Sequence, residues 1–382
     1  MQSNNKEKRT YFDWAASAPY HGNSTLVPYG NPSSQHNEGR AAKSALEDAR
    51  RRCASVLKVP PDTLYFTSGG TESNSIALFS NLKRPGKGRV ISSLTEHASI
   101  REGIETLEKM GKPVGNISVD SAGRVTCETL KKTLNQFDDV RFAAIMSVNN
   151  ETGAITDIPS IKKILNEHNG APIHLHCDLV QSIGKIPFDL VNWEIDSASI
   201  SAHKISGLHG FGLLYLKKPI DVFYTGGGQE NKIRGGTENT QGAVALATCL
   251  EKLGGIEQVS LFFEQAKNRW NKLITSLTAI ERCTIIPKER LINDDRFSPY
   301  ILQAAFKDIP GEVMARALDD LGIAVSTGSA CSSSSPERPV LTAMGIEEKL
   351  RIEGIRISQG YLTSDEDIEH LIFGISEVLK FL

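Results

Sequence analysis

Short apolar or β-branched runs alternate with longer helix-like segments over the first 250 residues, and this alternation constrains the fold more than any other feature of the chain. The runs occupy residues 64–67, 89–93, 142–148, 173–177, 197–201 and 212–216. Strands that alternate with helices in this way predict an α/β unit with a largely parallel sheet. The chain has 382 residues. Because a domain typically has roughly 150 residues, we expect about two structural lobes.

The sequence changes character after about residue 250. Residues 251–280 carry apolar side chains at helical spacing, and a strand-like run at 300–306, a helix at 311–322 and a strand at 354–358 follow. In the closing segment Ser364 stands three residues before Asp367, which is the spacing of a capping box at a helix start. This mixture predicts a smaller α+β lobe, with the boundary near residue 250.

Polar residues follow the ends of five predicted strands of the first lobe. They are Ser68, the pair Glu96–His97, the pair Asn149–Asn150, Asp178, and the pair His203–Lys204. In open α/β sheets, ligands bind at the carboxyl ends of the strands. We therefore expect a binding site where these five segments meet.

Four features of these segments together fit one cofactor. Gly70 and Thr71 open a helical pattern after a strand, which suits a bound anion, although a plain turn explains them equally well. Asp178 alone is usually a helix cap or a solvated charge, and Lys204 alone is usually a solvated surface group. A desolvated lysine, however, can form a Schiff base. A lysine, an acid, a phosphate-binding turn and a flat group such as His97 are what pyridoxal phosphate requires.

The six cysteines are scattered without a CxxC pair or a zinc-like spacing, which is typical of reduced thiols in a cytosolic protein. The pair His174 and His176 is explained as well by alternating strand positions as by a metal, so we expect no metal site. Cys331 lies in the polar stretch STGSACSSSSP, unlike a core cysteine. We expect it to be a thiol on a polar stretch that is free to act as a nucleophile.

The charge and hydropathy patterns exclude several classes of partner. The formal net charge is −2, with no clustered basic excess, so we expect no binding to nucleic acid. The start MQSNNKEKRTYFDW is polar, and no apolar run approaches the length of a membrane span. We expect neither a secretory signal nor a membrane segment, and a cytoplasmic location.

Ten motifs in order through nearly the whole chain resemble one known family. They are YFDWAAS, GNPSS, FTSGGTESNSIAL, TEHASI, VNNETG, DLVQSIGK, SAHKISGLHGFG, GGGQENKIRGGTEN, STGSACSSSS and IRISQG. The chain resembles the cysteine desulfurases of the NifS/IscS type, within the class V aminotransferase family of fold-type I pyridoxal phosphate enzymes. The resemblance implies a large cofactor-binding domain over 15–250 with a mostly parallel seven-stranded sheet. It also implies a smaller α+β domain, built from 1–14 and 251–382, that carries the cysteine loop.

The resemblance implies roles for residues around the cofactor. Lys204 would hold the cofactor and move the substrate's protons, and Asp178 would pair with the pyridinium nitrogen. His97 would stack on the ring and act in acid–base steps, while Gln181 would bind the phenolic oxygen. The phosphate would be held by Gly70, Thr71, Ser201 and His203, together with Thr237 of a second subunit, so a homodimer is implied.

The resemblance also implies a substrate and a product. Asn150, also placed at the cofactor, and Arg356 would hold the α-carboxylate of L-cysteine; a structural ion pair is the alternative for Arg356. Cys331 would take the substrate's sulfur as a persulfide, which leaves L-alanine. The sulfur would then pass to an acceptor protein, either an iron–sulfur cluster scaffold or a tRNA-thiolation protein.

Three departures from the family pattern and two rival functions remain. Segment 18–32 is short where relatives usually carry a helix, Leu179 and Val180 replace smaller residues, and Tyr361 replaces a common arginine. One rival is another enzyme of this fold, such as a selenocysteine lyase, a transaminase or a cysteine sulfinate-type lyase. The other is a sulfur-relay partner without catalysis. Cys331 argues against a transaminase, and the catalytic set argues against the relay partner.

Overall fold

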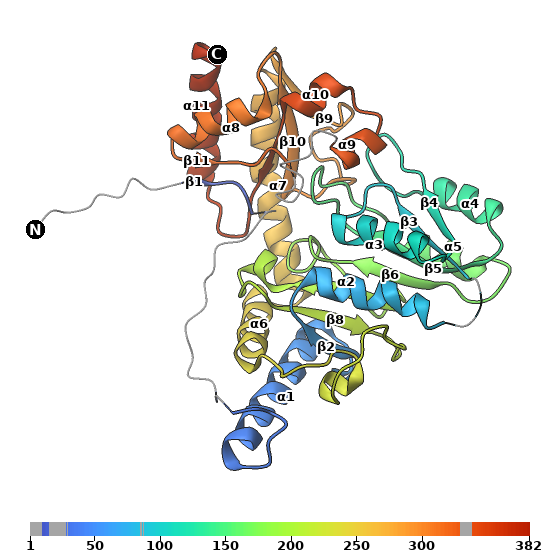
Figure 1. Ribbon diagram of the computed structural model, residues 1–382. Helices are drawn as coiled ribbons and strands as arrows, with labels where there is room; N and C mark the ends of the chain where they lie inside the picture. The colour runs from blue at the N-terminus through green and yellow to red at the C-terminus, as the bar shows by residue number, and fades with distance from the viewer. Residues whose placement is uncertain (1–9, 15–27, 29, 85, 87, 329–337) are drawn as a thin grey trace, which may run out of the picture.

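Two lobes make up the protein, a large one in the lower part of Figure 1 and a small one above it. The computed structural model describes residues 10–14, 28, 30–84, 86, 88–328 and 338–382. Helix α7 (Ile256–Thr278) runs between the two lobes (Figure 1).

A seven-stranded sheet forms the centre of the large lobe. Its spatial order is β2 (Leu64–Thr67), β8 (Gly212–Leu216), β7 (Ser197–Ser201), β6 (His174–Asp178), β5 (Val140–Met146), β3 (Arg89–Ser93) and β4 (Val114–Ile117). Strand β8 is antiparallel to both neighbours, while all the other pairs are parallel. The prediction of a mostly parallel α/β sheet is confirmed.

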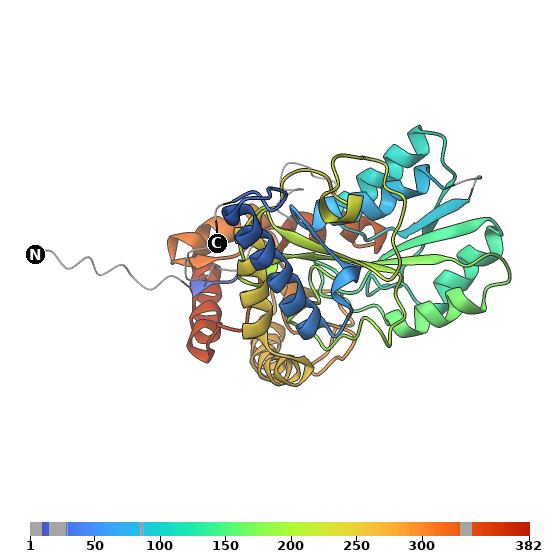
Figure 2. The same ribbon diagram turned by 90° about the horizontal axis from the view of Figure 1, so that it is seen from below.

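Helices cover both faces of this sheet (Figure 2). One face packs against α1 (Asn37–Leu57), α4 (Cys127–Gln136), α5 (Ile158–Glu167) and α6 (Thr240–Leu253). The other packs against α2 (Gly70–Phe79) and α3 (Ala98–Lys109). Four short 3₁₀ helices connect elements of this lobe: η1 (Pro61–Thr63), η2 (Ser80–Leu82), η3 (Ala202–Ile205) and η4 (Gln229–Lys232). Both faces are buried, and β5 and β8 are accordingly mostly apolar, whereas β6 (HLHCD) and β7 (SASIS) bury polar side chains as well.

The small lobe is built on a three-stranded antiparallel sheet. Strand β10 (Ile301–Phe306) lies between β9 (Cys283–Ile286) and β12 (Gly354–Ser358), and β1 (Thr10–Tyr11) pairs in parallel with β11 (Ile323–Ala324). Its helices, besides α7, are α8 (Gly311–Asp320), α9 (Pro339–Ala343), α10 (Glu348–Glu353) and α11 (Asp365–Phe381). Helix α11 begins with the capping box that Ser364 and Asp367 predict.

We propose that the two domains are residues 15–250 and residues 1–14 with 251–382. Two observations support this division. Phe12 packs in the apolar core that Trp270 and Phe306 form in the small lobe. Asp13 bridges to Ser358 of β12. In the part of the chain that the structure describes, no helix is both long and apolar enough to span a membrane.

Candidate active site

Three titratable groups from three strand ends share one electrostatic environment. His97 follows β3, Asp178 ends β6, and Lys204 lies in η3 directly after β7. Burial lowers the pKa of His97; the carboxylate of Asp178 opposes this shift and the amine of Lys204 adds to it. The structure therefore places these groups together, as the strand-end pattern predicts.

Asp178 is held by two donors at the end of its strand. The Asn74 side chain donates from Nδ2 to Asp178 Oδ2 at 2.8 Å, and the backbone N–H of Val180 donates to Oδ1 at 3.0 Å. An ionised carboxylate is acceptor-only, so two N–H donors suit its charged form. A buried negative charge at this point can pair with a protonated ring nitrogen.

His97 caps the start of helix α3 with its ring. Its Nδ1 accepts from the backbone N–H of Ser99 at 3.2 Å and lies 2.9 Å from Ser99 Oγ. Because a backbone N–H can only donate, the proton of the neutral ring sits on Nε2. The capping bonds hold the imidazole in one orientation.

A glycine turn joins β2 to α2 beside the site. Gly69 has φ 151° and ψ −177°, a conformation open essentially to glycine alone. At Gly70 a Cβ would lie 2.7 Å from Val180 Cγ2 and 3.6 Å from Ser201 Cβ. The backbone N–H groups at the start of α2 therefore lie close to Ser201, which suits an anion. Val180, one of the unusual larger residues, packs against this turn.

Ser201 and His203 are joined by a hydrogen bond. Ser201 Oγ lies 2.9 Å from His203 Nδ1, and the His203 ring stacks on His209 with centroids 5.4 Å apart. Burial and the nearby Lys204 lower the pKa of His203 to about 4, so its ring is neutral at physiological pH. A neutral imidazole and a hydroxyl can both donate to a phosphate oxygen.

Thr71 and Thr237 are both exposed. Thr71 is the second residue of α2, next to the glycine turn. Thr237 lies between η4 and α6, and no hydrogen bond or ion pair within the described chain joins it to the other candidates. The structure of one subunit does not bring Thr237 into the site.

Lys185, which the sequence reasoning missed, orients Gln181. Both side chains are buried, and Lys185 Nζ donates to Gln181 Oε1 at 2.5 Å. Because Gln181 Oε1 accepts this bond, the NH₂ group of Gln181 points away from Lys185 and can donate to a different acceptor. Burial, with Lys204 and Arg356 nearby, lowers the pKa of Lys185 to about 7. The spacing of four residues in DLVQSIGK was the only available signal.

Arg356 lies at the centre of β12 and is 1% exposed. Its Nη2 is 2.9 Å from Asp13 Oδ1, and its Nη1 donates to the backbone carbonyl of Asn150 at 3.0 Å. The ion pair weighed as the alternative for Arg356 is thus present. Arg356 Nε and Asn150 Oδ1 are both buried and have no hydrogen-bond partner among the residues that the structure describes. These two atoms can therefore form hydrogen bonds with a small polar ligand.

Cys331 and most of segment 18–32 lie outside the described residues. Both described flanks of the cysteine loop nevertheless lie near the site. Ser326 and Arg356 exchange backbone hydrogen bonds of 3.1 and 2.6 Å. At Gly328 a Cβ would lie 2.9 Å from Arg338 Nη1 and 3.7 Å from Glu151 Oε2. The loop therefore starts and ends next to the groups proposed to hold the substrate.

The donors and acceptors present fit pyridoxal phosphate. A buried carboxylate stands ready for the ring nitrogen, and a glycine turn with Ser201 stands ready for the phosphate. The amine of Lys204 lies close enough to shift the pKa of His97. The orphaned Oδ1 of Asn150 indicates that a polar group belongs beside it, since buried polar atoms are normally hydrogen-bonded.

Comparisons with known proteins agree over nearly the whole chain. A family model described as aminotransferase class-V matches residues 21–371. A cysteine desulfurase IscS of Dictyoglomus turgidum is 34% identical over 396 residues, which is 98% of this chain and 96% of that protein. One of Methanosarcina thermophila is 34% identical over 394 residues, 99% of this chain and 93% of its own.

Solved structures give the same result. A NifS-like protein superimposes with a TM-score of 0.87 at 33% identity and covers 98% of this chain and 100% of its own. A structure described as SspA in complex with cysteine has a TM-score of 0.76 at 27% identity, with 91% of this chain and 98% of that chain covered.

Proposed function

This chain belongs to the class V aminotransferase family and is a pyridoxal phosphate-dependent cysteine desulfurase, and we propose that Lys204, Asp178 and His97 carry its chemistry with Cys331 as the sulfur acceptor. The observation that carries this assignment is that Asn74 bonds to Asp178 and, through Ser99, to His97, whose pKa is also affected by Lys204. Bound pyridoxal phosphate would supply an electron sink for the substrate's Cα.

Residues around the ring have distinct tasks in this proposal. Lys204 would hold the cofactor through its aldehyde, and its Nζ would take the Cα proton of the substrate and return a proton. Asp178 keeps the ring nitrogen protonated, which makes the ring a better electron sink. His97 covers one ring face, and Gln181 donates from Nε2 to the phenolic oxygen because Lys185 occupies its Oε1.

The phosphate and the substrate carboxylate are held at two different places. Gly70, Thr71, Ser201 and His203 bind the phosphate, and Thr237 reaches it from a partner subunit. Arg356 and Asn150 hold the substrate's α-carboxylate, for which a guanidinium fork is well suited. The pairing of Arg356 with Asp13 fixes the guanidinium plane and leaves Nε toward the site.

Sulfur transfer requires the thiolate of Cys331. An unperturbed cysteine has a pKa of about 8.5, and only the thiolate is nucleophilic. Cys331 Sγ attacks the substrate's sulfur, so that an S–S bond forms and the substrate's Cβ–S bond breaks. The electron pair of the broken bond stays on the substrate carbon, which takes up a proton and leaves as part of L-alanine. A thiol of an acceptor protein, an iron–sulfur scaffold or a tRNA-thiolation protein, then removes the outer sulfur.

We propose a cytoplasmic homodimer. Thr237 is exposed, so its hydroxyl is open to a partner subunit. The neighbouring Phe223 and Tyr224 are 48% and 81% exposed, and aromatic side chains of this kind are enriched in interfaces. The cysteines within the described residues, Cys53, Cys127, Cys177, Cys249 and Cys283, are all free, which supports a reducing compartment.

Product analysis tests this function. The purified protein, incubated with L-cysteine and a reducing thiol, is expected to form alanine and sulfide in equal amounts. Lys204→Ala is expected to abolish both products. Cys331→Ala is expected to retain the cofactor's visible absorbance and lose sulfide release. A keto acid in place of alanine would indicate a transaminase, and a purified protein that takes up no cofactor would indicate the non-catalytic relay partner.

A further inference from the structure

Asn74, a residue of α2 that is 1% exposed, uses every hydrogen-bonding position of its side chain. Its Nδ2 donates to Asp178 Oδ2 at 2.8 Å and to Ser99 Oγ at 2.9 Å. Its Oδ1 lies 2.9 Å from His176 Nε2 and also accepts from the hydroxyl of Ser199. One buried amide therefore joins Asp178, the proposed partner of the cofactor's ring nitrogen, to other polar groups.

A chain of hydrogen bonds fixes which way this amide points, and it begins at Arg84. Arg84 Nη2 lies 3.2 Å from His174 Nδ1. A guanidinium can only donate, so His174 Nδ1 must accept. Burial lowers the pKa of His174 to about 3, which leaves one proton on its ring at neutral pH, and that proton sits on Nε2.

The same reasoning carries through the next two side chains. His174 Nε2 donates to Ser197 Oγ at 2.7 Å. The Ser197 hydroxyl in turn donates to His176 Nδ1 at 2.8 Å. Burial also lowers the pKa of His176 to about 3, so this ring carries its single proton on Nε2 and donates to Asn74 Oδ1. The NH₂ group of Asn74 must then face Asp178.

A second branch leads from Asn74 through Ser99 to His97. Because Asn74 donates to Ser99 Oγ, the Ser99 hydroxyl is available to donate to His97 Nδ1 at 2.9 Å. This agrees with the backbone bond that already makes His97 Nδ1 an acceptor. Asp178 and His97 are thus held by the same amide.

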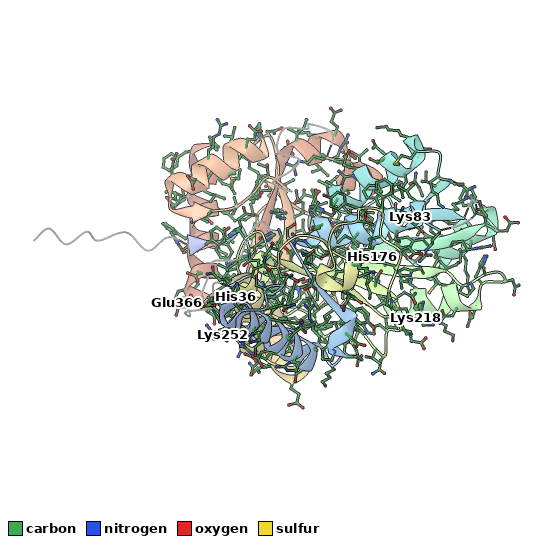
Figure 3. All side chains as sticks on the ribbon, turned by 60° about the horizontal axis from the view of Figure 1, so that its bottom comes forward. His36, Lys83, His176, Lys218, Lys252 and Glu366 are labelled. Carbon is green, nitrogen blue, oxygen red and sulfur yellow. The ribbon has the colours of Figure 1, made fainter. Side chains whose placement is uncertain are left out.

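The histidines of this hydrogen-bond chain are also held by packing. The ring of Phe142 stacks on His174 at 5.0 Å with 6° between the planes, and on His176 at 6.2 Å with 22°. His176 and Ser197 are both 0% exposed. Figure 3 labels His176 in the interior of the large lobe. Such a network has little freedom to reverse its direction.

We propose that Asn74 is a positioning residue that orients both Asp178 and His97, and that the chain from Arg84 through His174, Ser197 and His176 fixes the direction of its amide. The proposal rests on the proposed function of Asp178 and His97. A reversed amide would present its carbonyl oxygen to the Asp178 carboxylate, and two acceptors would then face each other without a proton between them.

Histidine tautomers test the direction of the chain. The full-length protein is labelled with ¹⁵N-histidine, and the ring nitrogens of His174 and His176 are assigned from the spectra of His174→Asn and His176→Asn. Both rings are expected to be neutral, with the proton on Nε2. A proton on Nδ1 of either ring, or a doubly protonated ring at neutral pH, would contradict the proposed direction.

Cofactor affinity tests the role of Asn74. Asn74→Asp keeps the volume and the acceptor for His176 but removes the donor to Asp178. A lost hydrogen bond to a charged group weakens binding by about tenfold or more, and we expect this loss in a pyridoxal phosphate titration of the cofactor-stripped chain. Asn81→Asp is the matched control, since Asn81 is also 1% exposed and donates only to the backbone carbonyl of Leu78, at 2.8 Å.

A second variant covers the case in which Asn74→Asp does not fold. Ser197→Ala interrupts the chain without adding charge, and a lost neutral hydrogen bond corresponds to an affinity loss of about fivefold. Ser80→Ala, at another buried serine, is its control. Wild-type affinity in folded Asn74→Asp or Ser197→Ala would overturn the proposal. A wild-type protein that binds no pyridoxal phosphate would instead overturn the proposed function.

Discussion

Glu96 is a wholly buried acid next to the candidate catalytic histidine. Its Oε1 accepts from the backbone N–H of Met146 at 2.9 Å, while Oε2 has no hydrogen-bond partner in the described part of the chain. Burial raises the pKa of Glu96 to about 8, with the charge of Asp178 adding to the effect. Glu96 is therefore a neutral acid at physiological pH.

This state predicts how stability depends on pH. Between 4.5 and about 8 the folded chain keeps a proton on Glu96 that the unfolded chain releases, so the contribution of Glu96 to stability is lost as pH rises through this window. Glu96→Gln mimics the neutral acid, and its advantage over the wild type in urea unfolding is expected to grow across the window and then level off. Glu105→Gln, at an exposed glutamate, is the control. A constant difference would contradict the buried neutral acid.

The effect of Lys185 on stability changes with pH in the opposite direction to that of Glu96. The pKa of Lys185 is lowered from 10.5 to about 7, so between these values the unfolded chain binds a proton that the folded chain does not. Stability contributed by this site therefore rises with pH over that window. Lys185→Met is expected to reduce the rise measured by urea unfolding and to weaken pyridoxal phosphate binding, since Gln181 loses its orienting donor. An unchanged pH slope would mean that Lys185 is protonated in the fold.

Sequence alone could identify Asp178, Lys204 and His97 as candidates because each follows a strand in a recognisable motif. It could not identify Lys185, whose importance comes from burial, or Asn74, whose importance comes from burial and from partners distant in the sequence. Asn74 contacts Asp178 and His176, about a hundred residues away. Nothing in the local pattern of α2 distinguishes Asn74 from a solvated helix residue.

At the scale of elements, the turn between β2 and α2 depends on the absence of a side chain at Gly70. A methyl group there would lie 2.7 Å from Val180 Cγ2. Gly70→Ala is expected to displace Val180 and the α2 N-terminus and to weaken pyridoxal phosphate binding by about tenfold or more, which is the loss of one charge-assisted hydrogen bond. Gly255→Ala, at the start of α7 with open space around it, should leave binding unchanged. Equal affinities in both variants would contradict a role of this turn in binding the phosphate.

A buried ion pair holds η4 against β2. Arg50 Nη1 and Nη2 each donate to a carboxylate oxygen of Glu230 at 2.7 Å, and the backbone N–H of Phe66 donates to Glu230 Oε2 at 2.7 Å. Removing one partner of such a pair costs about 3–5 kcal/mol. Glu230→Ala is expected to lose that much stability in chemical denaturation, whereas Glu251→Ala, at the more exposed pair with Arg52, should lose about 1 kcal/mol or less. Equal losses would contradict the buried pair.

Some strands were predicted with their correct bounds and others were missed, and the difference has a physical reason. Strands β2, β3, β7, β8 and β12 match their predicted bounds. All their residues except Arg89 are buried, which favours runs rich in small, apolar and β-branched side chains. Strand β4, Val114–Ile117, was missed. It lies at the sheet edge, is only partly buried and contains Gly115 and Asn116, so it carries no apolar run. The short strands β1 and β11 exist only through their pairing with each other.

For the whole molecule, the order of strands and helices was sufficient to predict the α/β class and the sheet edge at which the candidate residues lie. The antiparallel direction of β8 could not be read from its composition, because direction depends on the connection that crosses the sheet rather than on the strand's residues. The pairing of Arg356 with Asp13 could not be predicted either, because the two residues lie near opposite ends of the chain.

The central claim is that this fold delivers sulfur from L-cysteine to Cys331, and mass spectrometry of the protein tests it most directly. After brief incubation of the cofactor-loaded protein with L-cysteine and without a reducing thiol, the peptide that contains Cys331 is expected to gain one sulfur atom. The Cys331→Ala variant and the wild type treated with L-alanine should show no such gain. Alanine production with no added sulfur on Cys331 would contradict the account.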